Sequence, residues 1–230
     1  MTIGQEVKGF RGWLDYTGHT SSDTNWSAQY IYEHMLKVRA AFIKNKLSLG
    51  MKVGYENYKT IPCVKLIKVD RMECPCIPSK GCSFMKTVID MPRHLDISYV
   101  GSQQGEISYG YIEWNDIGDV VNHRMKAVAE APYYTWKNIN DRTPHYLYND
   151  IHKKYLTETF IPYDPIEYAL MPDCNGKVNH ALNAFEVEFV MDAELGKIIH
   201  DETYKSLVAP RPKDADVFPN NMKDMGLPNK

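Results

Sequence analysis

Short runs of alternating apolar and polar residues, joined by short polar links, dominate the chain between Tyr58 and Trp114. Such alternation is typical of strands that bury one face. It predicts four strands, at Ile61 to Val69, Phe84 to Ile89, Leu95 to Val100 and Ile107 to Trp114. Parallel neighbours need a crossover of about a dozen residues, and the links are shorter than that. We therefore expect an antiparallel sheet.

Three further runs downstream have strand character and are expected to complete the sheet. They are Tyr133 to Trp136, Pro144 to Asn149 and Tyr155 to Ile161, all rich in aromatic or β-branched residues. The stretch between Asn115 and Ala131 is ambiguous, because its spaced apolar residues also suit a short helix that Pro132 would close.

One long helix is predicted before the sheet, beginning near Trp26 and ending before Gly50. Apolar residues form two adjoining stripes at helical spacing: Ile31, Met35, Val38 and Phe42 in one, and Tyr32, Leu36, Ala40, Ile43 and Leu47 in the other. Two stripes indicate burial over a broad arc. The basic residues of this helix, Lys37, Arg39, Lys44 and Lys46, are expected to form a solvated polar face.

A shorter helix is predicted after the sheet, with Asp192 as its N-cap and Leu195, Ile198, Ile199 and Leu207 as its apolar contacts. Overall, the sequence predicts an α+β fold: an antiparallel β-sheet domain with N-terminal and C-terminal helices and extended terminal arms. The expected division is an extended N-terminal arm over residues 1–25, a mixed helix and antiparallel sheet core over residues 26–208, and an extended C-terminal tail over residues 209–230.

Composition and charge narrow the classes of protein. The hydrophobic fraction of 43% and the charged fraction of 24% are ordinary for a globular protein. A formal charge of -2 gives no global attraction to a phosphate backbone, which argues against tight DNA binding. No apolar run approaches the roughly 20 residues of a membrane helix, and no export signal is evident at Met1, so we expect synthesis in a cytoplasm. There, the five cysteines are expected to be reduced thiols.

One cluster of residues has metal-ligand chemistry. Cys74, Cys76 and Cys82 lie close together in sequence, with Cys63 and His94 on either side. Structural zinc sites prefer cysteine pairs spaced by two to four residues, and a one-residue gap with an intervening proline fits poorly. A zinc-binding module or metal-dependent enzyme centred on residues 74–82 therefore stays open as an alternative, and no metal or other cofactor is the main expectation.

The common catalytic motifs do not occur. The eight histidines are scattered, and the sequence has no nucleophile elbow, phosphate-binding loop or dinucleotide fingerprint. We expect no catalytic residues.

The order of elements resembles that of bacteriophage neck proteins, namely the head-to-tail connector or ring proteins of short-tailed phages, including the crAss-like group. The residues that carry the resemblance are the tyrosine-rich strands around Tyr146 to Tyr148, the strand that ends at Pro162-Tyr163-Asp164-Pro165, the helix around Ile198, and Pro212 to Asp214 with Asn220-Asn221 beyond it.

This resemblance implies a non-catalytic virion protein, made in the host cytoplasm, that forms a ring of about twelve copies and contacts the portal and other neck or tail proteins. A tail or capsid-decoration protein of the same virion is an alternative. The terminal arms would then contact neighbouring copies. The expected interface residues are Trp13 and Leu14 in the first arm, and Val217, Phe218 and Pro219 in the tail, because apolar residues on a polar extension need a partner.

Overall fold

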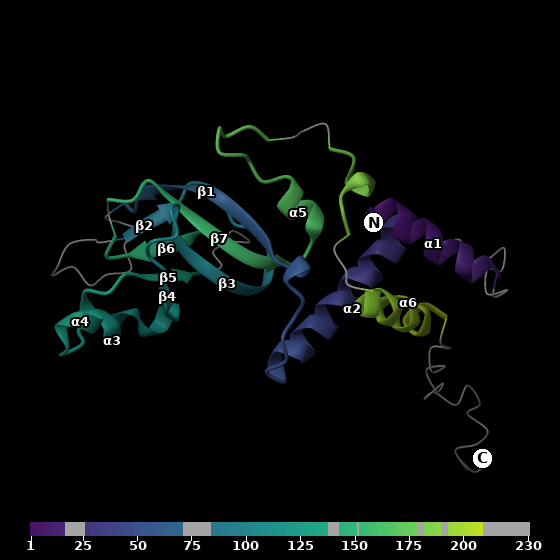
Figure 1. Ribbon diagram of the computed structural model, residues 1–230, viewed down its shortest axis with the longest axis horizontal. Coiled ribbons are helices and arrows are strands. Elements are labelled where there is room, and N and C mark those ends of the chain that lie inside the picture. The colour runs from purple at the N-terminus through teal and green to yellow at the C-terminus, as the bar shows by residue number, and fades with distance from the viewer. Residues whose placement is uncertain are drawn as a thin grey trace, which may run out of the picture.

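A layer of long helices lies beside a strongly curled β-sheet in the computed structural model (Figure 1). The structure describes residues 1–16, 26–70, 84–137, 143–150, 152–178, 182–189 and 193–208. The expected α+β class, with helices towards both ends of the chain, is confirmed. The expected tail over residues 209–230 lies outside the described residues.

The sheet has seven strands, in the order β3-β7-β1-β2-β6-β5-β4. The strands are β1 (Lys59–Lys68), β2 (Phe84–Thr87), β3 (His94–Ser102), β4 (Gly110–Tyr111), β5 (Tyr133–Trp136), β6 (His145–Tyr148) and β7 (Tyr155–Pro162). The predicted runs correspond to these strands, but the run from Ile107 to Trp114 gives only the two residues of β4.

Most strand pairs are antiparallel, as predicted, but β4 and β5 are parallel, which makes the sheet mixed. The physical reason is the connection between β4 and β5. Its residues 112–132 contain η2 (Trp114–Asp116) and the short helices α3 (Ile117–Val121) and α4 (Lys126–Ala129), which together are long enough for a crossover. The connection between β4 and β5 is therefore longer than the short links from which we predicted antiparallel pairing.

The sheet curls until it is nearly a barrel. The segment leading into β4 spans the two sheet edges, because Ser108 bridges to Gly101 on β3 while Tyr111 pairs with β5. Inward-pointing residues alternate along the strands except where register shifts interrupt β1 and β3, as between Ile61 and Val64. The buried interior contains Ile61, Val64, Leu66, Met85, Met91, Val100, Tyr109, Tyr134, Leu147, Leu156 and Phe160.

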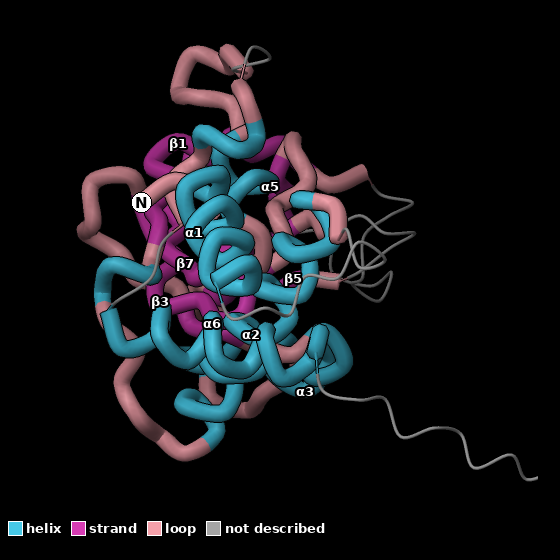
Figure 2. The backbone as a smooth tube through the Cα atoms, turned by 90° about the vertical axis from the view of Figure 1, so that its right-hand side faces the viewer, coloured by secondary structure: helices cyan, strands magenta, loops and turns pink. Residues whose placement is uncertain are grey.

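Three longer helices form the second layer and cover one end of the barrel (Figure 2). They are α1 (Ile3–Tyr16), α2 (Ala28–Ser48) and α6 (Ala193–Val208). The predicted helix near Trp26 is α2, and its N-cap is Ser27, whose side chain accepts a hydrogen bond from the Tyr30 amide at 3.1 Å. The predicted final helix is α6. Asp192, its expected N-cap, lies outside the described residues.

The expected extended arm over residues 1–25 is wrong for residues 3–16, which form α1. Thr2 and Gln5 build a capping box: the Thr2 amide donates to Gln5 Oε1 at 3.0 Å, and the Gln5 amide donates to Thr2 Oγ1 at 3.2 Å. The buried face of α1 consists of Ile3, Val7, Phe10 and Leu14, with Glu6 beside them. Burial of this face outweighs the cost of three helical glycines.

Side chains of α1 and α6 hold the two helices together. The ring of Phe10 lies 5.6 Å from that of His200 between centroids, and Trp13 lies 4.8 Å from Tyr204. His200 Nε2 is also 3.0 Å from the buried carboxylate of Glu6. The first residues of the chain are therefore part of the core.

A buried arginine joins the helical layer to the sheet. Arg39 on α2 is 0% exposed, and its Nη1 donates to the carbonyl oxygen of Pro162, at the end of β7, at 2.9 Å. Asp164 follows, caps the short helix α5 (Pro165–Ala169) and accepts from the Tyr32 hydroxyl at 2.7 Å. Burial lowers the pKa of Arg39 to about 10, so the guanidinium is still charged at neutral pH. The expectation that Arg39 lies on a solvated face is wrong.

Candidate functional site

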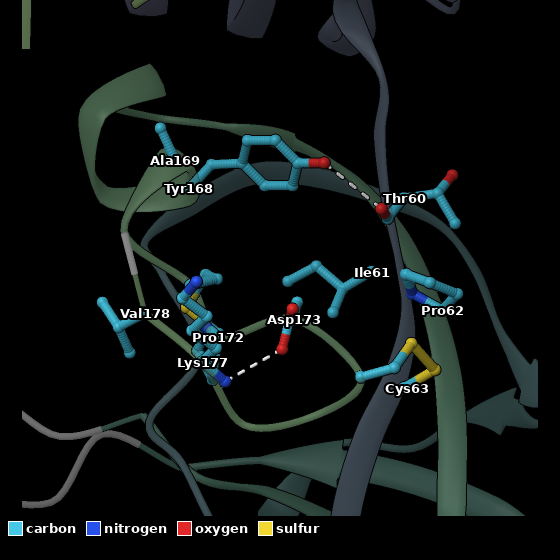
Figure 3. Close-up of a pocket in the computed structure, with 12 residues that line it drawn as sticks. Thr60, Ile61, Pro62, Cys63, Tyr168, Ala169, Pro172, Asp173, Lys177 and Val178 are labelled. Carbon is cyan, nitrogen blue, oxygen red and sulfur yellow. Dashed lines mark hydrogen bonds between the residues drawn. A yellow bond between two sulfur atoms is a disulfide. The ribbon is translucent and has the colours of Figure 1, made fainter. Parts of the chain in front are cut away.

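A surface cavity of about 820 Å³ lies between β1 and the loop that follows α5 (Figure 3). Its lining is mostly apolar and comes from two chain segments far apart in sequence. The lining residues are Thr60, Ile61, Pro62, Cys63, Tyr168, Ala169, Met171, Pro172, Asp173, Cys174, Lys177 and Val178. Concave, largely apolar sites of this size are where proteins commonly bind ligands.

One wall of the cavity is a strand edge. The first half of β1 pairs with β7, through Lys59 to Lys65. Its other side meets β2 only from Leu66 onward, apart from the Val88 amide, which donates to the Lys65 carbonyl. Between Thr60 and Val64, therefore, no described strand pairs with that side of β1. A proline such as Pro62, which has no amide hydrogen, is typical of an edge position.

The loop over this edge is fixed by a local turn. Asp173 Oδ1 accepts hydrogen bonds from the amides of Asn175 at 2.9 Å and Lys177 at 2.8 Å, and Gly176 adopts a φ of 77°. These amides hold the pKa of Asp173 below its ordinary value. Figure 3 shows the Asp173 carboxylate at the cavity, but its Oδ1 is already hydrogen-bonded to the backbone of its own turn.

A disulfide bond joins the loop to the strand. Cys63 on β1 and Cys174 in the loop are 111 residues apart in sequence, with their Cα atoms 5.1 Å apart. The expectation of reduced thiols is therefore wrong for these two cysteines, because the fold brings them within bonding distance. Cys63 is also unavailable as a metal ligand. Covering an edge with a loop is one way in which proteins protect unpaired strands.

The polar groups around the cavity suit binding better than chemistry. The Tyr168 hydroxyl donates to the Thr60 carbonyl at 3.3 Å, and burial raises the pKa of that hydroxyl. Asp173 is held by its turn, and Lys177 is exposed. The described lining thus offers a strand edge, an apolar wall and the opposite charges of Lys177 and Asp173.

A second group of titratable residues lies inside the barrel. Glu158 on β7 is 0% exposed and His145 on β6 is 2% exposed, and His145 Nδ1 lies 3.0 Å from Glu158 Oε1. The ring of His94 packs 5.6 Å from that of His145 between centroids. Burial, followed by the nearby His145, lowers the pKa of His94. Glu158 and His145 are enclosed by the barrel, where a substrate in solution does not reach them.

Sequence reasoning missed this pair, although one signal pointed to it. Glu158 lies between Leu156 and Phe160 in the alternating pattern of β7, so the register of the strand places it on the inner face. The loop at the cavity also had a signal in the sequence, because the residues from Asp173 to Gly176 are typical of a tight turn.

The expected interface residues are partly contradicted. Leu14 is 1% exposed and lies in the core of its own chain, so it cannot contact a neighbour. Trp13 is partly exposed but packs on Tyr204. Val217, Phe218 and Pro219 lie outside the described residues.

The proposed zinc ligands are not brought together in the described part of the chain. Cys74, Cys76 and Cys82 lie outside the described residues. His94, the remaining candidate, is packed between Trp136 and His145 inside the barrel. Among the residues that the structure describes, no three His, Cys, Asp or Glu side chains are grouped so as to hold a metal ion.

Two exposed apolar patches lie on different elements. The helix-end patch, Leu49, Met51 and Tyr55, follows the C-terminal end of α2. The strand patch consists of three exposed residues: Ile67 on β1, Tyr155 on β7, and Val88, which directly follows β2. Its members are neighbours in the sheet, because Tyr155 pairs with Lys65 and Val88 donates to the Lys65 carbonyl.

No protein-family model matches this chain, and a search of curated proteins finds no relative. Of the helices in the described residues, none has the length and apolar character needed to cross a membrane.

Proposed function

We propose that this chain is a non-catalytic structural subunit of a bacteriophage neck, in which about twelve copies form a ring in the head-to-tail connector. The proposal rests on the order of sequence elements and on the two exposed apolar patches. Its partners would be copies of itself, the portal and other neck or tail proteins. Its location would be the virion, after synthesis in the host cytoplasm.

The observation that carries the proposal is the placement of the patches. A ring closes through a heterologous contact, in which one surface of a subunit meets a different surface of the next. The chain offers two such surfaces: the helix-end patch and the strand patch. Figure 1 draws the C-terminal end of α2 and the far end of β1 on different sides of the molecule. An isologous dimer needs only one self-complementary patch.

The polar chemistry also supports a structural role. The closest pair of titratable groups in the barrel, Glu158 and His145, is enclosed. At the cavity, the Asp173 carboxylate is occupied by two backbone amides. A general acid or base must reach its substrate within hydrogen-bonding distance, and neither of these two carboxylates is free to do so.

Complementary variants test this arrangement in the full chain. The first variant carries Leu49→Glu and Met51→Glu in the helix-end patch, and the second carries Ile67→Glu and Val88→Glu in the strand patch. Each variant alone is expected to lose rings in native mass spectrometry, because charges at an apolar contact oppose association. Mixed together, they keep one intact contact and are expected to form dimers that do not grow.

Met125→Glu is the matched control, because Met125 is exposed and belongs to neither patch. Circular dichroism and thermal melting establish that all variants fold. Rings that persist in both patch variants would contradict the proposal. So would a mixture that stays monomeric although the unmodified chain assembles.

A further inference from the structure

We propose that the disulfide between Cys63 and Cys174 is a redox-active site that small thiols open in the folded chain, and that its opening releases the loop over residues 171–178 from β1. The reactant belongs to the class of low-molecular-weight thiols, of which glutathione is an example. This reactivity goes beyond the proposed function and is independent of it, because it rests on the loop and the strand alone.

The disulfide lies at the surface, where a thiol in solution can reach it. Cys174 is exposed and Cys63 is partly exposed, and both line the open cavity of about 820 Å³. Figure 3 shows the bond between β1 and the loop. Access to the attacked sulfur is one of the factors that set the rate of thiol-disulfide exchange, and exposed disulfides are typically the labile ones.

A side-chain amide favours cleavage in one direction. Gln103, which directly follows β3, donates a hydrogen bond from its Nε2 to Cys63 Sγ at 3.3 Å. Such a bond stabilises a sulfur that carries negative charge more than a neutral one, and a more stable thiolate leaves faster. Cys63 is therefore the leaving sulfur, and the more exposed Cys174 is the sulfur that is attacked.

The reaction consumes two thiols. A glutathione thiolate attacks Cys174 Sγ and forms a mixed disulfide, while the bond to Cys63 breaks and its electron pair stays on Cys63 Sγ, which takes a proton from water. A second glutathione thiolate attacks the glutathione sulfur of the mixed disulfide and releases Cys174 as a thiolate. The protein disulfide gains two electrons, and glutathione is oxidised to its disulfide. Excess glutathione disulfide reverses both steps.

The loop has few other attachments to the strand. Its turn is internal, because Asp173 Oδ1 accepts from the amides of Asn175 and Lys177. In the described part of the chain, no hydrogen bond or ion pair joins residues 171–178 to β1. Apart from the disulfide, apolar packing such as that of Met171 against the barrel cluster holds the loop in place. Cleavage of the disulfide therefore removes the one bond that fixes the loop to the strand.

The release is expected to be local. The pairing of β1 with β7, from Lys59 to Lys65, does not involve the disulfide, and the Tyr168 hydroxyl still reaches the Thr60 carbonyl after cleavage. The part of the chain that changes is thus the loop and the strand edge beneath it. A cytoplasm keeps accessible thiols reduced, so the loop is expected to be free there and fastened in an oxidising medium.

Reduction kinetics of the full chain test the reactivity. The folded chain is treated with glutathione at about pH 8, free thiols are blocked with iodoacetamide at intervals, and peptide mapping locates the modified cysteines. The rate is expected to lie within about a hundredfold of that of the chain unfolded in urea, with the mixed disulfide on Cys174. A slower rate would overturn the proposal, because the bond would then open only on unfolding. A mixed disulfide confined to Cys63 would overturn the assignment of the attacked sulfur.

Gln103→Leu tests the leaving group. It is expected to slow reduction of the folded chain by about threefold or more and to leave the rate in urea unchanged, because the hydrogen bond to Cys63 exists in the folded chain alone. Gln104→Leu is the matched control, because Gln104 is the neighbouring exposed glutamine. Equal rates for the two variants would contradict the role of Gln103.

Limited proteolysis tests the release of the loop. Two samples represent the open state without free reductant: the double variant Cys63→Ser and Cys174→Ser, and the unmodified chain reduced and then blocked with iodoacetamide. Cleavage by trypsin after Lys177 is expected to be at least about tenfold faster in both than in the oxidised chain, because a protease needs a mobile segment. Cleavage after Lys44, on the exposed side of α2, is the control and is expected to stay slow. Unchanged cleavage after Lys177, or an equal rise after Lys44, would overturn a local release.

Discussion

Arg39 is the residue whose environment differs most from the sequence expectation. A cation in the basic stretch of α2 is ordinarily solvated, yet this one is 0% exposed and bonded to the carbonyl oxygen of Pro162. Its helical spacing distinguishes it from Lys37 and Lys44, because it falls between the two apolar stripes, four residues from Met35 and from Ile43, whereas the two lysines are exposed. The carbonyl at the end of β7, which accepts its hydrogen bond, is a tertiary feature that the sequence did not predict.

Replacement of Arg39 is expected to loosen the junction between helices and sheet. Arg39→Ala leaves the carbonyl of Pro162 without its partner and creates a cavity, so we expect a loss of about 3 kcal/mol in the free energy of unfolding. Urea denaturation measures it. Lys44→Ala, on the exposed side of the same helix, is expected to change stability by less than about 0.5 kcal/mol. Equal effects of the two substitutions would contradict the buried role of Arg39.

His94 is expected to make stability depend on pH. Burial lowers its pKa in the folded state, so as the pH falls through the ordinary histidine range the unfolded chain binds more protons at this residue than the folded chain does. Its contribution is complete above the ordinary histidine pKa of about 6.5 and is lost as the pH falls below that value. Denaturation curves at pH 7.5 and 5.5 should therefore differ less for His94→Asn than for the unmodified chain. An unchanged difference would show that His94 does not cause the dependence.

At the scale of elements, strong periodicity was predictive and weak periodicity was not. The strands β1 and β7 and the helix α2 follow patterns long enough to decide their type. Helix α1 was missed because Gly4, Gly9 and Gly12 weaken its helix propensity, although the capping box and the spacing of Ile3, Val7, Phe10 and Leu14 were present. The mixed sheet was missed because the crossover before β5 is built from two very short helices.

The glycine at position 4 has a packing role. A Cβ there would lie 2.9 Å from the Phe185 carbonyl oxygen, in the segment that the start of α1 packs against. Gly4→Ala removes a poor helix former but forces this contact apart, so we expect net destabilisation by about 1–3 kcal/mol. Gly9→Ala, where a Cβ would meet nothing within 4 Å, is expected to stabilise the chain. Thermal melting compares the two. A stabilising Gly4→Ala would contradict the packing described for α1.

The disulfide was beyond prediction because its partners are 111 residues apart in sequence, and only the curl of β1 beneath the 170–178 loop brings them together. Removing it with Cys63→Ser and Cys174→Ser releases a long loop in the unfolded chain. We expect a loss of about 2–5 kcal/mol, measured by denaturation. A reductant should reproduce the loss in the unmodified chain and have no further effect on the double variant. An unmodified chain that is insensitive to reductant would contradict a stabilising role for the bond.

At the scale of the whole molecule, a well-packed body is distinct from the surfaces to which we assign contacts in the proposed ring. Apolar side chains fill the helical core and most of the barrel interior, which also encloses Glu158 and His145, and Arg39 joins the two layers. In the described part of the chain, the surface includes the helix-end patch, the strand patch and the strand edge at the cavity. From the sequence we expected contacts with neighbouring copies but could not locate these patches. Their exposure depends on which strand faces other elements leave uncovered.

The native mass of the full chain, measured over a range of concentrations and accompanied by electron microscopy, tests the central claim most directly. The account predicts an assembly of about twelve times the 26.5 kDa of one chain, visible as a closed ring with an open centre. A chain that stays at 26.5 kDa, or stops at a twofold dimer, at every concentration would contradict it.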